Sequence, residues 1–554
     1  MTAEPQSVAE AWLRLLAEHG VDYLFANSGT DFASIVEAFA RAEQLGLAVP
    51  RPIIAPHENA AVSMAHGYAA VTGRAQAVMV HVNVGTANCV AGLINAERDY
   101  IPMLLAAGRT PILEAGAPGA RSLNIHWAQE MFDQAGMVRE TVRWDYELRD
   151  PRQMPTVTVR ALALAHSAPR GPVYLSLPRE VLALPAAPGP APRMAAANPS
   201  APDPAGVVAA AKLLTAAARP LIITARAGAD PAVPALLGQL ATRLGAVVVE
   251  YRPRHMNLST AHPLHGGFEV APWLAEADAV LVLDCDVPWM PASDRTHPAA
   301  KVIQAGEDPL HARYPVRGFP ADLTLPAAPR LLLQALLDEL GTAARPAAES
   351  IEKCARLRAA ALQSVQAPPA RMTMAWASAC LDRARAPGSI LVNEYPLVRP
   401  VMHVTEPGTF FGSSPAGALG WGLPAAMGVK LAAPEREVIA AVGDGSHIFA
   451  NPVACHQIAA AERIPTLSVV FNNAGWGAVG RATRAMYPDG HAVKANVMPL
   501  TRLNPAPSHA GVAEACGVAG FTASDPAGLP GVLDQALAVV RQGRPALVDI
   551  ICPE

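Results

Sequence analysis

Short runs of apolar, mostly β-branched residues recur along the chain, and stretches with helical periodicity lie between them. In the first third of the chain the apolar runs are VDYLFA (21–26), RPIIAP (51–56), AQAVMVHV (75–82), PMLLAA (102–107) and GPVYLSLP (171–178). Two of the helices are expected to start near Asn59 and Ala87. Unbroken apolar strands that alternate with helices are typical of parallel strands buried on both faces. We therefore expect crossover units of the right-handed kind.

The same alternation returns twice, after two segments that interrupt it. Seven prolines between residues 183 and 205 indicate a semi-rigid linker, and a polar helix within 343–370 indicates a second one. A chain of 554 residues is also too long for a single core. We predict an α/β protein with three doubly wound parallel-sheet domains, at residues 1–182, 206–342 and 371–554.

Composition narrows the classes of partner and the compartment. Charged residues make up 16% of the chain and the formal net charge is −4, so no broad positive surface is expected for nucleic acid or for an anionic membrane. No run of about 18 or more apolar residues occurs, and the N-terminus has no apolar stretch of a signal peptide. The seven cysteines form no CxxC pair. We therefore expect a cytoplasmic protein with reduced thiols, and neither nucleic-acid nor membrane partners.

Oxygen-bearing side chains stand at the ends of two successive apolar runs in the third domain. Asp444 lies in GDG (443–445) directly after VIAAV, and Asn473 ends the next run, SVVFNN, with 28 residues between the two. Open parallel sheets place ligands at the carboxyl ends of their strands. A carboxylate, an amide oxygen and a turn carbonyl are ligands that suit Mg²⁺, with phosphate oxygens completing the shell. A tight turn would explain GDG alone, but the pair at this spacing favours a metal–phosphate site.

The GDG motif, its spacing and the following NN resemble the signature of thiamine-diphosphate enzymes. The resemblance covers nearly the whole chain and implies a pyrimidine-binding domain at 1–182, a middle domain at 206–342 and a diphosphate-binding domain at 371–554. It assigns Mg²⁺ to Asp444, Asn473 and the carbonyl of Gly475. It assigns contacts with the cofactor to a further set of residues: Gly443, Gly445, Ser446, Gly475 and, at the end of the run 389–394, Asn393.

Glu58 is the candidate for activation of that cofactor. It lies in HENAA (57–61), at the expected start of an apolar helix. An acidic residue that caps a helix would be the ordinary explanation, but the segment resembles the glutamate motif of the same family. The resemblance implies a carboxyl group beside N1′ of the pyrimidine, which promotes loss of the C2 proton and gives an ylid. Glu58 and Asp444 lie on different domains, and in the family such groups meet across a subunit interface, so we expect a homodimer or a dimer of dimers.

The segment 406–432 resembles the glycine-rich stretch that holds the pyrimidine. In the family, a bulky residue at the position of Leu419 keeps the cofactor bent, and a carbonyl at the position of Gly417 accepts its 4′-amino group. A helix start rich in small residues that only packs well would explain either residue alone.

Three further residues resemble positions of the benzoylformate decarboxylase and acetolactate synthase group. Thr30 in FANSGTD matches a substrate-binding serine of benzoylformate decarboxylase, and His81 matches its catalytic histidine. Gln129 matches a glutamine that acetolactate synthases place near the cofactor. A histidine near neutrality can relay a proton, although a purely structural histidine at a strand end is an equal alternative. The chain departs from the group in lacking a histidine within 287–294 and in carrying Val479 where pyruvate decarboxylases have an acid.

The resemblance implies an enzyme that cleaves, or forms, the bond beside a 2-oxo group through an enamine on the cofactor. Within this class the alternative is acetolactate synthesis from two pyruvates, and outside it a cofactor-binding scaffold without activity. Acetolactate synthases also bind FAD in the middle domain. The segment 225–231, which follows the first apolar run of that domain, lacks a glycine cluster suited to a pyrophosphate, so we expect no FAD.

Overall fold

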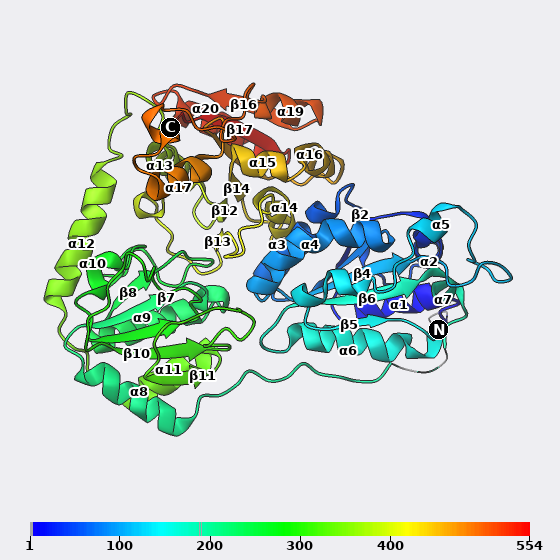
Figure 1. Cartoon of the computed structure of the whole chain (residues 1–554), viewed down its shortest axis with the longest axis horizontal. Helices are drawn as coiled ribbons and strands as arrows, with labels where there is room; N and C mark the ends of the chain where they lie inside the picture. Colours follow the sequence, from blue (N-terminus) through cyan, green and yellow to red (C-terminus); the bar gives the residue numbers. More distant parts are fainter. Residues whose placement is uncertain (1–3, 188, 190, 554) are drawn as a thin grey trace.

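The computed structural model describes residues 4–187, 189 and 191–553, and it holds three parallel sheets in chain order (Figure 1). The strand orders are β2-β1-β3-β4-β6-β5, β11-β10-β9-β7-β8 and β13-β12-β14-β15-β17-β16. Helices cover both faces of each sheet. The predicted α/β class with three doubly wound parallel-sheet domains is therefore confirmed. No described helix combines the length and the apolar character needed to span a membrane.

The first sheet is buried on both faces, because successive side chains along its strands point alternately into two cores. Its strands are β1 (Tyr23–Asn27), β2 (Arg51–Ile54), β3 (Gln76–Val80), β4 (Met103–Arg109), β5 (Asp145–Glu147) and β6 (Pro172–Pro178). Its helices are α1 (Val8–Glu18), α2 (Ala33–Leu45), α3 (Glu58–Thr72), α4 (Val82–Arg98), α5 (Ile125–Ala128), α6 (Met154–His166) and α7 (Arg179–Ala183). Ala77 and Met79 face the core under α1 and α6, whereas Val78 and Val80 face the core under α3 and α4. This two-sided burial explains the unbroken apolar run.

The second sheet follows the proline-rich segment. Its elements are α8 (Pro204–Ala216), β7 (Pro220–Thr224), α9 (Val233–Leu244), β8 (Val247–Glu250), α10 (Ala271–Leu274), β9 (Ala279–Leu283), β10 (Lys301–Gly306), β11 (Leu323–Pro326) and α11 (Pro329–Leu340). The side chain of Asp203 accepts a hydrogen bond from the Gly206 N–H and thus caps α8, which starts at Pro204. The polar helix α12 (Ala348–Gln363) then leads to the third sheet.

The third sheet carries the candidate metal–phosphate residues. Its strands are β12 (Ile390–Glu394), β13 (Phe410–Gly412), β14 (Val438–Gly443), β15 (Leu467–Asn472), β16 (Ala519–Ala523) and β17 (Ala546–Ile551). Its helices are α13 (Met374–Ala384), α14 (Gly422–Ala432), α15 (Asp444–Phe449), α16 (Pro452–Ala461), α17 (Gly477–Met486), α18 (His491–Lys494), α19 (His509–Ala515) and α20 (Leu529–Arg541). Because β14 pairs with β15 in parallel, Asp444 and Asn473 emerge side by side at the same edge.

Helices α3 and α14 join the first and third domains within one chain (Figure 1). A Cβ atom added to Gly67 would lie 2.0 Å from the carbonyl oxygen of Ala425, and one added to Gly428 would lie 1.9 Å from that of Met64. The two backbones can approach this closely only because both positions are glycine. The contact places the first turn of α3, which begins at Glu58, beside the loop that leads into α14.

Three expectations about elements were wrong. Helix α4 begins at Val82, not near Ala87, and His81 is the residue before its first turn. The strand in the apolar run 75–82 is therefore shorter than expected and ends at Val80. Strands β5, β11, β13 and β16 were also not predicted, because each is a short strand at the edge of its sheet. An edge strand with one partner does not need the long apolar run of a central strand.

Buried histidines should make the fold sensitive to acid. Burial lowers the pKa of His66 and His311 to about 3 and that of His456 to about 4. These side chains are neutral in the folded chain but take up protons below about pH 6.5 when unfolded. Stability is therefore fully present above that pH and is lost as the pH falls towards 4, by up to about 1.4 kcal/mol per pH unit for each histidine.

Thermal unfolding between pH 7.5 and 5 tests this expectation. The apparent Tm should fall steadily below about pH 6.5, and His456→Gln should flatten the decline relative to the unaltered chain. An apparent Tm that is unchanged or higher at pH 5 would contradict it.

Candidate active site

Two side-chain oxygens converge at the carboxyl ends of β14 and β15. Asp444 Oδ2 and Asn473 Oδ1 accept hydrogen bonds from the same backbone N–H, that of Gly475, at 2.9 and 3.1 Å. The side chain of Asp444 is 3% exposed, and burial raises its pKa while the N–H groups of Gly445 and Gly475 oppose that rise. A carboxylate held in this way gains from a nearby divalent cation, which offsets its loss of hydration.

The surroundings of the two GDG glycines differ. A Cβ atom on Gly443 would meet only the Ser446 hydroxyl, 3.9 Å away, so there is open space beside this residue. A Cβ atom on Gly445 would lie 2.4 Å from the Trp476 ring. Gly443 therefore leaves room for a phosphate beside the backbone, whereas Gly445 is required by the packing of Trp476.

Glu394 connects three parts of this edge and was not predicted as a site residue. Its carboxylate accepts hydrogen bonds from the N–H groups of Gly420 and Gly422, at 2.8 and 2.6 Å, and from the hydroxyl of Ser446. It is 1% exposed, and burial raises its pKa. The signal in the sequence was an acidic residue at the end of a buried strand, opposite a glycine-rich segment. Glu394 thus ties the glycine-rich loop to the turn that carries Asp444.

Asn393, the neighbour of Glu394, has its side chain engaged with the backbone. Its Oδ1 accepts a hydrogen bond from the Leu397 N–H at 3.1 Å, and its carbonyl accepts one from the Ser413 hydroxyl. The residue is 8% exposed. It therefore shapes the loop after β12, and its contact with a cofactor stays a prediction.

The glycine-rich loop is fixed by a residue of the first domain. Asn95 Nδ2 donates to the carbonyl of Ala418 at 2.8 Å, and Asn95 Oδ1 accepts from the N–H of Ala418 at 3.2 Å. Gly417 has a φ of 67°, which favours glycine. The two hydrogen bonds set the backbone direction on either side of Ala418, so Gly417 and Leu419 are held at the partly exposed side of the loop.

Both oxygens of the Glu58 carboxylate accept hydrogen bonds from amide groups. Asn27 Nδ2 donates to Oε1 and Asn88 Nδ2 donates to Oε2, each at 2.9 Å. Glu58 is 6% exposed, and in the described part of the chain these donors come from its own domain. A Cβ atom on Gly85 would lie 3.3 Å from Oε1, so the space beside the carboxylate is narrow. The side chain is held in place without a cationic partner in these hydrogen bonds.

His81 forms a pair with an acid that the sequence interpretation had passed over. Its Nδ1 lies 2.6 Å from Asp31 Oδ1, and Asp31 Oδ2 accepts from the Val82 N–H at 3.3 Å. This hydrogen bond raises the pKa of His81, and the charge of Glu58 adds to the effect. The other ring nitrogen, Nε2, lies 3.5 Å from Gln129 Nε2. Asp31 thus orients the ring and leaves Nε2 for chemistry.

The four residues expected to act on substrate are not equally close together. His81 and Gln129 meet, and the charge of Glu58 acts on His81. Thr30 is exposed, and its carbonyl accepts from Arg179 Nη1 at 3.4 Å; the neighbour Asp31, not Thr30, reaches His81. Trp289, in the segment 287–294 that lacks the histidine of the benzoylformate decarboxylase group, packs against Phe319 in the second domain and is 4% exposed.

Asp31→Asn should move the pH dependence of any reaction that uses His81. Removing the carboxylate lowers the pKa of His81, so the limb of the pH profile that depends on protonated His81 should shift to lower pH. The rate should fall by about tenfold or more, because a positioned acid–base group contributes about 10²–10⁴ in rate. Profiles of kcat/KM over pH 5–9 for Asp31→Asn and for its neighbour Thr30→Val test this. An unshifted limb in Asp31→Asn, or an equal shift in Thr30→Val, would contradict the pairing.

A cavity of about 460 Å³ opens beside the converging oxygens. Asn473 and Gly475 line it, together with Trp476, Met498 and Arg502. A small molecule that carries a negative charge and an apolar group would find partners for both.

Three family models match consecutive parts of the chain. Residues 6–137 match the N-terminal TPP binding domain of thiamine pyrophosphate enzymes, residues 207–336 match their central domain, and residues 395–550 match their C-terminal TPP binding domain. Thiamine pyrophosphate is another name for thiamine diphosphate.

Individual relatives resemble the chain along nearly its whole length. It is 26% identical to the benzoylformate decarboxylase of Pseudomonas aeruginosa over 563 residues, or 98% of each protein. It is also 26% identical to the large subunit of acetolactate synthase isozyme 3 of Escherichia coli, over 99% of this chain and 95% of the relative. The solved structure of a 4-hydroxybenzoylformate decarboxylase of Rhodococcus jostii is similar in fold, with a TM-score of 0.82, 22% identity and 99% of both chains covered.

Proposed function

The chain belongs to the family of thiamine pyrophosphate enzymes, and on that premise we propose that it is a Mg²⁺-dependent lyase that removes CO₂ from a 2-oxo acid. The resemblance to the benzoylformate decarboxylase and acetolactate synthase group is confirmed, and the chain is a carbon–carbon lyase or transferase of that kind. The observation that carries the proposal is the set of buried, positioned acids, Glu58 and Asp444, each at the end of a strand or the start of a helix.

The residues present suit the diphosphate end of the cofactor. Asp444 and Asn473 supply a carboxylate and an amide oxygen, and the carbonyl of Gly475 would complete a set of oxygen donors for Mg²⁺. In the described residues, no three or more histidine, cysteine, aspartate or glutamate side chains are grouped so that they could hold a metal. The proposed site does not need such a group, because an amide and a backbone carbonyl supply two of its three oxygens. The open space at Gly443 would take a phosphate.

The residues around Glu58 suit the pyrimidine end. When bound, the cofactor supplies a carbon nucleophile at C2 and accepts the electron pair released with CO₂. Glu58 would share a proton with the pyrimidine ring, held by Asn27 and Asn88. Leu419 and the Gly417 carbonyl would fix the angle between the two rings. His81, oriented by Asp31, would hold or deliver a proton at Nε2, with Gln129 beside it.

We propose a homodimer or dimer of dimers whose active sites lie between subunits. Exposed apolar side chains lie near Asp444 and near Gln129, where a partner subunit would cover them. Phe449 and Val453, which follow Asp444, are 53% and 58% exposed, and Trp127 and Phe132, which lie on either side of Gln129, are 50% and 112% exposed. Multi-angle light scattering of the purified chain should give a dimer or tetramer mass; a monomer at micromolar concentration would contradict this part.

We also propose that the enzyme is cytoplasmic and needs no FAD. All seven cysteines are free, and six of them are buried, as expected in a reducing compartment. Arg226 Nη2 and Asp284 Oδ2 form a buried ion pair, 3.0 Å apart, across the carboxyl ends of β7 and β9. A dinucleotide in an open sheet of this kind would lie there, where the strand order reverses. A flavin absorption spectrum in the purified protein would contradict the proposal that the enzyme needs no FAD.

A substrate screen tests the proposed reaction. The chain, reconstituted with thiamine diphosphate and Mg²⁺, should release CO₂ from at least one of a panel of aliphatic and aromatic 2-oxo acids. The same panel without Mg²⁺ or with His81→Ala is the control. Binding of the cofactor without release of CO₂ from any acid would contradict decarboxylation and favour a scaffold without activity.

Acetolactate synthesis is the second candidate within the class. The position of Gln129, beside His81 at 3.5 Å, favours it, because that glutamine was matched to acetolactate synthases. Pyruvate alone as substrate separates the two: acetolactate in the product mixture supports carboligation, whereas acetaldehyde supports simple decarboxylation.

A further inference from the structure

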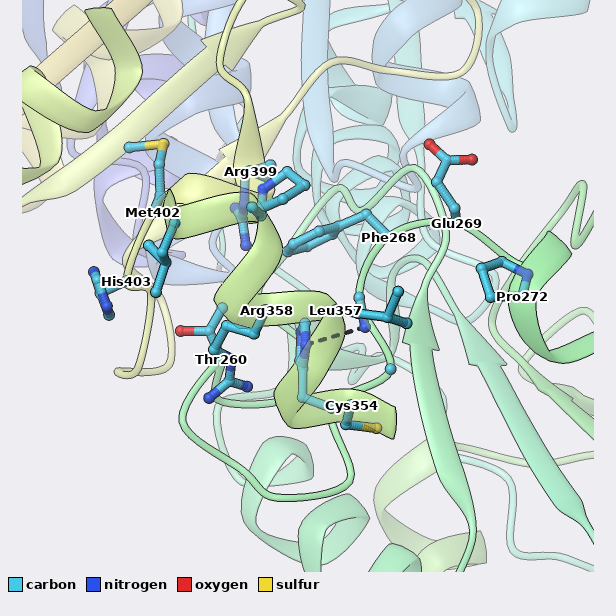
Figure 2. A pocket seen from close by; sticks show the side chains of 16 residues that line it. Thr260, Phe268, Glu269, Pro272, Cys354, Leu357, Arg358, Arg399, Met402 and His403 are labelled. Carbon is cyan, nitrogen blue, oxygen red and sulfur yellow. Dashed lines mark hydrogen bonds between the residues drawn. The ribbon is translucent and has the colours of Figure 1, made fainter. Parts of the chain in front are cut away.

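A cavity of about 230 Å³ lies where three parts of the chain meet, and neither Glu58 nor Asp444 lines it (Figure 2). One wall is the segment 260–272 of the second domain, another is helix α12, and the third is the segment 399–403 after β12. The last segment begins five residues after Glu394, which holds the glycine-rich loop.

Arg399 lines this cavity, and its guanidinium group has no hydrogen-bond partner in the described part of the chain. It begins the short helix η6 (Arg399–Val401) and is 6% exposed. Within the described ranges, none of its three guanidinium nitrogens makes a hydrogen bond. Arginine carries five N–H donors, and buried polar groups are normally paired. A buried guanidinium that makes no hydrogen bond and faces a cavity is therefore unusual and needs a physical reason.

The nearest carboxylate is already engaged. Glu250 Oε2 lies 4.0 Å from Arg399, beyond hydrogen-bond distance, and accepts from His265 Nε2 at 2.9 Å. Glu250 Oε1 accepts from the N–H of Asn257 at 2.5 Å. Glu250 therefore stabilises the charge of Arg399 from a distance but leaves its donors free.

Two aromatic rings hold the guanidinium but do not satisfy its N–H groups. Its central carbon lies 3.6 Å from the ring centre of Phe410 and 5.0 Å from that of Phe268. A purely structural cation–π contact is the alternative role for this side chain. Burial lowers the pKa of Arg399 only to about 10, so the side chain stays charged at neutral pH.

The rest of the lining is mainly apolar. Figure 2 shows Phe268 between Arg399 and Glu269, with Met402 and Leu357 on other sides of the space. Arg358, a second cation of the lining, donates to the His262 carbonyl at 3.5 Å. A phosphate or sulfate would use the N–H donors of Arg399 but would gain nothing from the apolar wall. A carboxylate with an apolar body would match the donors with its oxygens and the wall with its body.

We propose that this cavity binds a small monocarboxylate with an apolar body, whose two oxygens take the N–H fork of Arg399. The body lies against Phe268, Leu357 and Met402. The ligand thereby joins the second domain and α12 to the segment after β12. The site is separate from the residues proposed to bind the cofactor, so it stands or fails independently of the proposed reaction.

Benzoate is the probe, and thermal unfolding with calorimetry is the readout. Benzoate should raise the apparent Tm of the full chain in a saturable way, because a ligand that binds only the folded state stabilises it. Benzyl alcohol, which has the apolar body without the charge, and acetate, which has the carboxylate without the apolar body, should give no comparable shift at the same concentration. The absence of a shift with benzoate, or an equal shift with either control, would overturn the proposal.

Arg399→Met should weaken benzoate binding at least tenfold, and Arg383→Met is the matched control. Arg383 lies over Trp376 at 5.0 Å, in the same domain but outside the cavity, so its variant should bind benzoate as the unaltered chain does. Without ligand, Arg399→Met should lose little stability, because methionine can keep the packing against Phe268 and Phe410 while Glu250 keeps its hydrogen bonds to His265 and Asn257. A large fall in the Tm of Arg399→Met without ligand would show that Arg399 serves only to stabilise the fold, and it would overturn the proposal.

Two further variants distinguish binding in this cavity from binding in the candidate active site. Ala361→Phe fills the cavity and leaves Arg399 in place. It should abolish the benzoate-induced rise in Tm. If Arg399→Met does not fold, this variant tests whether benzoate binds in the cavity. Asp444→Ala, in the candidate cofactor site, should keep the shift. Loss of the shift in Asp444→Ala, or its persistence in Ala361→Phe, would place benzoate in the active site and overturn the proposal.

Discussion

Glu58→Gln is expected to leave the affinity for thiamine diphosphate nearly unchanged and to lower turnover by about two to four orders of magnitude. Glutamine fills the same space, and the amide groups of Asn27 and Asn88 can rotate to meet it, so the fold and the cofactor site should persist. What is lost is the acidic group that can share a proton with the pyrimidine ring. Isothermal titration with the cofactor and a CO₂-release assay measure the two quantities separately.

The matched control for this variant is Glu10→Gln. Glu10 is buried in the same domain, at 1% exposure, but pairs with Arg41 on the opposite face of the sheet. Its variant should keep the turnover of the unaltered chain even if it is less stable. Unaltered turnover in Glu58→Gln, or an equal loss in Glu10→Gln, would remove Glu58 from the reaction.

Asp444→Ala should instead act on cofactor affinity. Removing one charged member of a buried, paired set costs about 3–5 kcal/mol, which corresponds to roughly two to four orders of magnitude in Kd. The loss should be seen as a right-shifted titration with thiamine diphosphate at saturating Mg²⁺. Because Trp476 packs against Gly445, its fluorescence offers a second readout of binding at this edge.

Glu437→Ala is the control for the metal assignment. Glu437, whose side chain is 8% exposed, precedes the same strand, β14, at the end opposite to Asp444, and it pairs with Arg541. Its variant should bind the cofactor within about threefold of the unaltered chain, as expected for a distant and independent site. An unchanged affinity in Asp444→Ala would exclude Asp444 as a metal ligand.

The sequence was sufficient where a motif coincided with a strand end. Asp444 and Asn473 follow long central strands, and central strands carry unbroken apolar runs that can be recognised without a structure. The prediction that both oxygens meet depended only on successive runs forming neighbouring parallel strands, which β14 and β15 do. The fold class followed from the same pattern.

The sequence was not sufficient where a contact depends on strand order. Asp31 and His81 are 50 residues apart, and they meet because β1 lies next to β3 while β2 lies outside both. Apolar runs do not reveal that order. Helix α4 begins with β-branched and glycine residues at Val82–Gly85, which favour a strand or a turn locally, so its start was placed too late. The cavity at Arg399 needs three remote segments and could not be derived from any motif.

The exchange of the C2 hydrogen of thiamine diphosphate with deuterium, followed by NMR on the reconstituted enzyme, tests the central claim most directly. It requires no knowledge of the substrate and depends on both the Mg²⁺ site and Glu58. We predict exchange orders of magnitude faster than for the free cofactor with Mg²⁺ present, and near the free rate in Glu58→Gln. Exchange at the free rate in the unaltered, cofactor-saturated enzyme would contradict the roles proposed for Glu58 and the metal site.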